Sequence, residues 1–171
     1  MTSANEEKLK VVICWHMHQP EYRDLRKNEY QPPWTYLHVI KDYVDMVDHL
    51  ETIPGARAVV NFTPTLLEQI EDYKYQIKDF LQHNTPLRDP LLASLTCDKL
   101  PSSPPLRLQI IQDCLRANRE RLVDRFPAYQ KLANMSQWFI DNHDTVFYLK
   151  EQYLFDLLTW HHLAWIGETV K

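Results

Sequence analysis

The sequence predicts an α/β fold in which two parallel strands precede a mainly helical segment. Short apolar runs at residues 9–18 and 58–62 are each followed by a stretch whose apolar residues recur with the period of a helix. Strands that alternate with helices in this way pair in parallel through right-handed crossovers. After residue 62 the pattern is helical, and no further run has the character of a strand.

The first run, residues 9–18, is β-branched and almost continuously apolar, which is typical of a parallel strand buried on both faces. Gln19 and Pro20 end it. A connection of about 16 residues then extends to Trp34, and structureless loops of this length are often functional. The next apolar stripe predicts a helix over 35–51, which Pro54 and Gly55 terminate.

The second strand, residues 58–62, leads into a helix that opens at Thr63-Pro64-Thr65. Thr65 and Glu68 have the spacing of a capping box at its start. Residues 82–106 then hold five of the eleven prolines, which predicts an irregular connection. The remaining helices are expected at 91–97, at 106–126, from Pro127 onward and at 151–166.

Two strands do not make a finished parallel sheet. We therefore expect residues 1–81 to form the start of a β/α barrel. Residues 82–171 would be a helical insertion in, or continuation of, the same catalytic domain, so that the chain holds only part of that domain.

Composition narrows the classes of function. With 19 basic and 23 acidic residues the net charge is −4, which disfavours nucleic acid as a partner. Residues 1–8 are polar and no apolar stretch is long enough for a membrane span, so we expect a cytoplasmic protein without a membrane partner. Three separated cysteines are expected to be reduced and buried. Only two glycines are present, which excludes P-loops and dinucleotide fingerprints, and no cofactor is expected.

The most informative residues are His16, His18 and Gln19. His16 and His18 point to the same side of the first strand because successive strand residues alternate faces. They lie at the carboxyl end of that strand, where parallel α/β folds build their sites. Two imidazoles and an amide there can bond sugar hydroxyls, bind a metal or transfer protons.

Two alternatives remain open at this point. A His-x-His pair on a first barrel strand is also the metal motif of amidohydrolase-like enzymes, although those need further ligands on later strands. A non-catalytic module that binds glycans or a partner is the other alternative. His161 and His162 are adjacent on a predicted helix, about 100° apart, and this spacing does not make a chelating pair.

Residues 16–20, His-Met-His-Gln-Pro, closely resemble the first conserved region of family 57 glycoside hydrolases. Further stretches resemble members of that family described as α-amylase or α-mannosidase-like, and the resemblance covers roughly residues 9–171. These stretches are residues 33–38, 40–43, 60–64 and 163–168.

The resemblance implies an incomplete barrel of seven β/α units that acts on α-glucans or related oligosaccharides and retains anomeric configuration. It assigns part of the sugar-binding subsite to His16, His18 and Gln19. The family's catalytic Glu and Asp lie in regions with no match here, so no catalytic residue and no metal ligand is assigned. The remainder of the catalytic domain is the expected partner.

Four other side chains near the predicted site have two interpretations each. Trp34 offers a flat apolar face for a sugar ring, or anchors the following helix in the core. Asn61, at the end of the second strand, contacts substrate or caps the next turn. Glu21 and Asp24 lie in the long loop near the histidines, and solvated loop acids are the better interpretation because charged residues are mostly exposed.

Overall fold

The computed structural model describes residues 9–171, and the polar segment 1–8 lies outside the described residues. Two strands, β1 (Cys14–Met17) and β4 (Val59–Phe62), form a parallel pair, as the sequence predicted. The antiparallel pair β2 (Arg23–Asp24) and β3 (Glu29–Tyr30) lies in the connection after β1. The helical segments that follow β3 and β4 are α1 (Trp34–His38), η1 (Val39–Tyr43), α2 (Val44–Thr52), α3 (Pro64–His83), α4 (Pro90–Thr96), α5 (Pro104–Leu115), η2 (Arg119–Val123), α6 (Pro127–Asp141), η3 (His143–Tyr148) and α7 (Glu151–Ala164).

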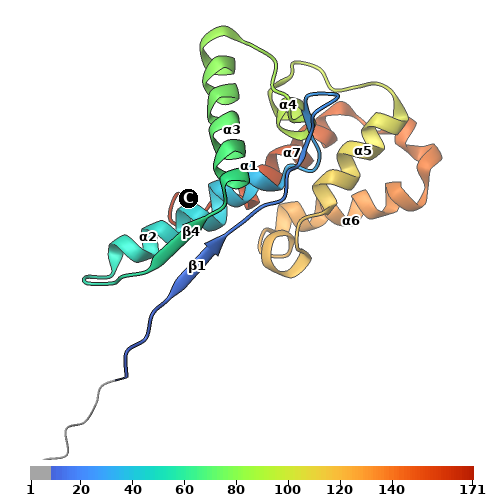
Figure 1. Cartoon of the computed structure of the whole chain (residues 1–171). Helices are drawn as coiled ribbons and strands as arrows, with labels where there is room; N and C mark the ends of the chain where they lie inside the picture. Colours follow the sequence, from blue (N-terminus) through green and yellow to red (C-terminus); the bar gives the residue numbers. More distant parts are fainter. Residues whose placement is uncertain (1–8) are drawn as a thin grey trace, which may run out of the picture.

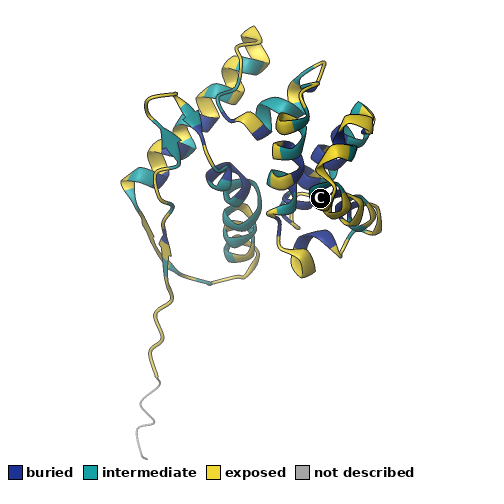
Figure 2. Ribbon diagram, turned by 90° about the vertical axis from the view of Figure 1, so that its right-hand side faces the viewer, coloured by how far each residue is buried: buried dark blue, intermediate teal, exposed yellow. Residues whose placement is uncertain are grey.

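The elements fall into two regions that share one core (Figure 1). The β1–β4 pair and α2 extend to one side, and α3 rises from the end of β4. Helices α4 to α7 pack together on the other side. The buried cluster runs through both, from Tyr36 and Tyr73 to Leu154 and Trp165. In Figure 2 the buried residues gather among the helices, whereas residues 9–13, which lead into β1, are exposed.

The first strand is shorter than the sequence predicted. Its parallel ladder joins Cys14 to Val59 and Met17 to Phe62, and residues 9–13 are exposed. The reason is the length of the partner, because β4 has only four residues. The prediction that the strand is buried on both faces is therefore wrong, and Val11 and Val12 remain 75% and 76% exposed.

The register divides the β1–β4 pair into two faces, since paired residues in neighbouring strands share a face. Met17 and Phe62 point toward the helices, and Phe62 lines an apolar groove of about 410 Å³ with Val47 and Ile70. The opposite side, which we call the open face, is formed by four exposed residues. They are Cys14, His16, Val59 and Asn61.

The long connection after β1 is more ordered than the sequence suggested. The Asp24 carboxylate accepts hydrogen bonds from the backbone amides of Arg26 (2.9 Å) and Lys27 (3.3 Å), and Asn28 adopts a left-handed conformation. These contacts close the β2–β3 hairpin. Hairpin signals so short were not recognised, because two-residue strands carry no visible alternation.

The helices match the predicted positions but differ at their ends. The helix expected over 35–51 begins at Trp34, passes through the π-helical η1 and ends at Thr52. The helix expected over 106–126 ends at Leu115. A new helical segment, η2, then begins after Asn118, whose side chain caps it by accepting a hydrogen bond from the backbone amide of Arg121. An Asn at this position competes with the helix by capping a new turn.

The capping box at Thr65 and Glu68 is not formed. Helix α3 begins two residues earlier than this box requires, at Pro64, with Thr63 as its N-cap. Glu68 instead accepts a hydrogen bond from Arg23 at 2.6 Å. Proline at the first helical position explains the shift, since its fixed φ suits that position and it has no amide hydrogen to cap.

The structure tests two expectations, that the cysteines are reduced and buried and that no segment spans a membrane. All three cysteines are free thiols, but only Cys114 is buried, and Cys14 is exposed on the open face. The expectation that all three are buried is therefore wrong. Within residues 9–171, every helix is too short or too polar to cross a bilayer.

Candidate functional site

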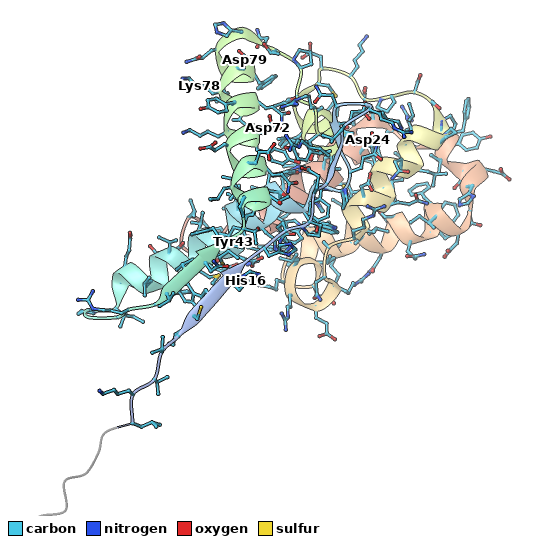
Figure 3. All side chains as sticks on the ribbon, viewed as in Figure 1. His16, Asp24, Tyr43, Asp72, Lys78 and Asp79 are labelled. Atoms are coloured by element: carbon cyan, nitrogen blue, oxygen red, sulfur yellow. The ribbon has the colours of Figure 1, made fainter. Side chains whose placement is uncertain are left out.

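The two histidines at the end of β1 lie as the strand geometry predicted. The rings of His16 and His18 are nearly parallel, with centroids 6.0 Å apart and planes 8° from each other. His16 Nδ1 lies 2.7 Å from Oδ1 of Asn61, its register partner on β4. Because Oδ1 only accepts, this contact places a proton on Nδ1, and in the neutral ring this tautomer has Nε2 as an acceptor. Figure 3 shows His16 on the β1–β4 strand pair.

Asn61 therefore orients His16 instead of capping the turn after β4. Both side chains are exposed on the open face. The pair presents an imidazole acceptor and an amide nitrogen side by side, each with hydrogen-bonding capacity beyond their mutual contact. This is the combination that recognises a group that both donates and accepts, such as a hydroxyl.

Gln19 is held by two tyrosine hydroxyls that the sequence analysis did not single out. The Tyr22 hydroxyl donates to Gln19 Oε1 at 3.0 Å, and Gln19 Nε2 donates to the Tyr43 hydroxyl at 3.3 Å. Burial raises the pKa of Tyr22 above its ordinary value, so its hydroxyl remains a donor. An amide makes up to four hydrogen bonds, so Gln19 keeps one donor and one acceptor for a ligand.

Tyr22 and Tyr43 carried no signal that would reveal this role. Tyr43 belongs to the apolar stripe of its helix, and Tyr22 lies in a loop. Only the folded chain brings both hydroxyls to Gln19.

Trp34 is half-buried at the start of α1. Its ring lies 5.9 Å from that of Trp165 and 6.3 Å from that of His38, measured between centroids. Trp165 and His38 meet edge to face at 5.4 Å. Trp34 thus packs at the border of the core, and contact between its remaining exposed surface and a sugar stays a prediction.

The acidic residues near the histidines are engaged in structural contacts. Glu21 receives two hydrogen bonds from the Arg23 guanidinium, at 3.0 and 2.8 Å, and these hold the pKa of the Glu21 carboxyl below its usual value. Asp24 closes its own hairpin, on which Figure 3 labels it. The Asp42 carboxylate is hydrogen-bonded to His38, with Oδ2 2.5 Å from Nδ1 of the ring. A carboxyl that stays ionised is unsuited to act as a general acid near neutral pH.

His161 and His162 are both buried, with their rings edge to face and centroids 5.4 Å apart, and each bonds to different partners. His161 Nδ1 lies 3.1 Å from the carbonyl oxygen of Cys114 and 3.1 Å from the Tyr129 hydroxyl. His162 contacts the Tyr36 hydroxyl at 2.6 Å through Nε2. Burial lowers the pKa of His161 to about 3, so this ring is neutral in the fold.

Metal ligation was the alternative use of His16 and His18. Across the described residues, 9–171, no three His, Cys, Asp or Glu side chains come close enough to hold an ion together. An amidohydrolase-like centre requires such a set. His16 is also already bonded to Asn61 through one of its two ring nitrogens.

The fold and the site define an α/β protein whose open strand pair presents imidazole and amide groups at the strands' carboxyl ends. These groups suit a polyhydroxylated ligand, which is the ligand class of glycoside hydrolases. The chain matches the model of glycosyl hydrolase family 57 over residues 12–165, and it belongs to that family. Its substrate class is therefore carbohydrate. No curated protein and no solved structure matches it.

Proposed function

We propose that this chain supplies part of the sugar-binding subsite of a retaining α-glycoside hydrolase or transglycosylase that acts on α-glucans or related oligosaccharides. The observation that carries the proposal is the juxtaposition of His16 with Asn61 on the open face, with Gln19 fixed just beyond. These groups lie at the carboxyl end of parallel strands, and family membership supports a carbohydrate as their ligand.

In this account the side chains bind and orient the sugar. In its neutral form His16 accepts from one hydroxyl at Nε2, and the remaining donor and acceptor of Gln19 bond to another. The ring of His18 stacks beside that of His16, with centroids 6.0 Å apart, and presents a second imidazole to the same sugar. The exposed surface of Trp34 provides an apolar face for the C–H side of a sugar.

Cleavage with retention requires two carboxyl groups about 5–5.5 Å apart. Glu21 and Asp24, which follow the histidines in the chain, and Asp42, which contacts His38, are engaged in the contacts given above. We therefore propose that other β/α units of an incomplete seven-unit barrel contribute the nucleophile and the acid/base. The β1–β4 pair, with α2 and α3 on one side, would be the first two units of that barrel.

Point variants test the binding role. His16→Ala and Gln19→Ala should each weaken the affinity for maltotetraose roughly five- to tenfold, because each loses about 1–1.4 kcal/mol of hydrogen bonding. Isothermal titration calorimetry on the 171-residue chain measures this loss. His49→Ala and Gln82→Ala are the matched controls, since both residues are exposed and lie on α2 and α3.

Two results would contradict the proposal. One is equal affinity in the site variants and the controls. The other is hydrolysis of maltooligosaccharides by the purified chain, because the proposal gives this chain the binding groups and not the reacting carboxylates.

A further inference from the structure

Gln69, on the second turn of α3, is a fully buried amide, with none of its surface exposed. Its Oε1 accepts from the backbone amide of Tyr22 and from the Thr35 hydroxyl, both at 3.2 Å. Its Nε2 donates to the carbonyl oxygens of Pro20 (2.8 Å) and Thr65 (3.2 Å). All four hydrogen-bonding positions of the amide are therefore used within the protein.

The orientation of this amide follows from its partners. The backbone nitrogen of Tyr22 can only donate, so it requires the oxygen of Gln69. The carbonyls of Pro20 and Thr65 can only accept, so they require the nitrogen. Leaving any of these buried groups without a partner would cost about 1–3 kcal/mol, which favours a single arrangement.

The hydrogen bonds of Gln69 hold the turn that directly follows Gln19. Pro20 and Tyr22 flank Glu21, and both are bonded to Gln69 through their backbones. Gln19 comes directly before Pro20, and the Tyr22 hydroxyl donates to its Oε1 at 3.0 Å. One buried amide thus fixes the turn on which Gln19 lies and also fixes the backbone of the tyrosine that orients it.

The same amide reaches the other end of the long connection. Thr35, which is fully buried, follows Trp34 and bonds to Gln69 Oε1. The α1–η1 segment that starts here carries Tyr43, the second hydroxyl on Gln19. Gln69 therefore joins both ends of the connection to α3, with Thr65 in the first turn of that helix.

We propose that Gln69 is the positioning residue of the sugar-binding turn and acts on Gln19 through Pro20 and Tyr22. This inference rests on the proposed function. Gln69 touches no sugar in this account. It holds the Gln19 amide in the orientation that presents one donor and one acceptor to the ligand.

The first test needs no ligand. In ¹⁵N-labelled protein, Gln69→Leu removes all four contacts, and Gln69→Glu keeps the acceptor but places a carboxylate against two carbonyls. Both should move the side-chain NH₂ signals of Gln19 toward those of a free glutamine and speed hydrogen exchange at the Tyr22 amide. Gln82→Leu and Gln82→Glu, at an exposed position of the same helix, should leave these signals in place.

The second test separates positioning from general stability by a double-mutant cycle with maltotetraose affinity as the readout. Gln69→Glu alone should weaken binding roughly tenfold, the equivalent of one well-placed hydrogen bond. In a Tyr22→Phe background, which lacks the hydroxyl on Gln19, the same change should weaken binding much less. A purely structural role for Gln69 would give equal effects in both backgrounds.

The outcomes are distinct. If the folded Gln69 variants keep the wild-type Gln19 signals, the inference is overturned, and full affinity in Gln69→Glu overturns it as well. If wild-type chain binds no maltotetraose, the proposed function fails, and the Gln19 signals alone decide the role of Gln69. If Gln69→Leu does not fold, Gln69→Glu decides in both tests.

Discussion

At the scale of single residues, the site and the core use histidine in opposite ways. His16 and His18 are exposed at the end of β1, where ring nitrogens can meet a ligand. His161 is fully buried, with its Nδ1 near a carbonyl and a tyrosine hydroxyl. From the sequence, the spacing predicts that His16 and His18 share a face, because alternate strand residues do, and that the adjacent His161 and His162 on a helix do not form a chelating pair.

The buried histidine makes stability depend on pH. The folded pKa of His161 is about 3, against about 6.5 for an unfolded chain, because burial disfavours the charged ring. Burial also lowers the pKa of His162. As pH falls below about 6.5 the unfolded chain binds protons that the fold does not. The contribution of neutral His161 to the free energy of unfolding is therefore fully present above about pH 6.5. Below that pH the free energy of unfolding falls by up to ~1.4 kcal/mol per pH unit, until about pH 3.

Urea unfolding between pH 7.5 and 4.5 measures this slope. His161→Gln should be less stable than wild type at pH 7.5, since a buried contact is altered, but its stability should fall less steeply with acid. His49→Gln, at an exposed position of α2, should keep the wild-type slope. An unchanged slope in His161→Gln would show that another group carries the acid sensitivity.

At the scale of elements, the sequence predicted which segments form but not where each stops. The parallel pairing of two strands and the helices after them follow from apolar periodicity, which is a property of the segment itself. The end of β1 is set by the four residues of β4, which are distant in the chain. The π-helical segment η2 and the β2–β3 hairpin depend on single capping residues, Asn118 and Asp24, and these signals are weak.

The candidate site divides in the same way. The His16, His18 and Gln19 set could be predicted because its members are neighbours on one strand end. Tyr22, Tyr43 and Gln69 could not, since their roles arise from contacts that only the fold creates. The matched stretch 60–64 contains Asn61, but its bond to His16 appears only with the register of β4 on β1.

The open edges of the β1–β4 pair predict a measurable property. Val12, two residues before β1, is 76% exposed and Val59 on β4 is 54% exposed, so apolar surface along the strand pair and the segment that leads into it meets solvent. Such surfaces bind apolar dyes and pair with other strands. Val12→Lys and Val59→Lys should each lower the fluorescence of bound anilinonaphthalene sulfonate and slow aggregation, because a charge on a strand opposes both.

Leu81→Lys is the matched control for the strand variants. Leu81 is 74% exposed near the end of α3, away from the strands, so this change should leave dye binding near the wild-type level. Equal reductions in all three variants would mean that net charge, not the open strand pair, governs the dye signal.

At the scale of the whole molecule, one core joins the strand region to the helices while one side of the sheet stays open. Tyr36 and Tyr73 pack in the same cluster as Leu154 and Trp165. The open face lies on the side of the β1–β4 pair away from the apolar groove formed with α2 and α3. In the proposed function, this architecture would present the sugar-binding groups on the open face and leave the opposite side of the sugar to other elements.

The central claim is that this open face, with its flanking turn, is where the chain binds carbohydrate. An NMR titration of the ¹⁵N-labelled chain with maltotetraose tests it most directly. Carbohydrate binding at the open face should give saturable shifts at His16, His18, Gln19 and Asn61, with smaller shifts at the Trp34 indole and none along α5 and α6. Saturable shifts confined to the helical region, or no saturable shifts at all, would contradict it.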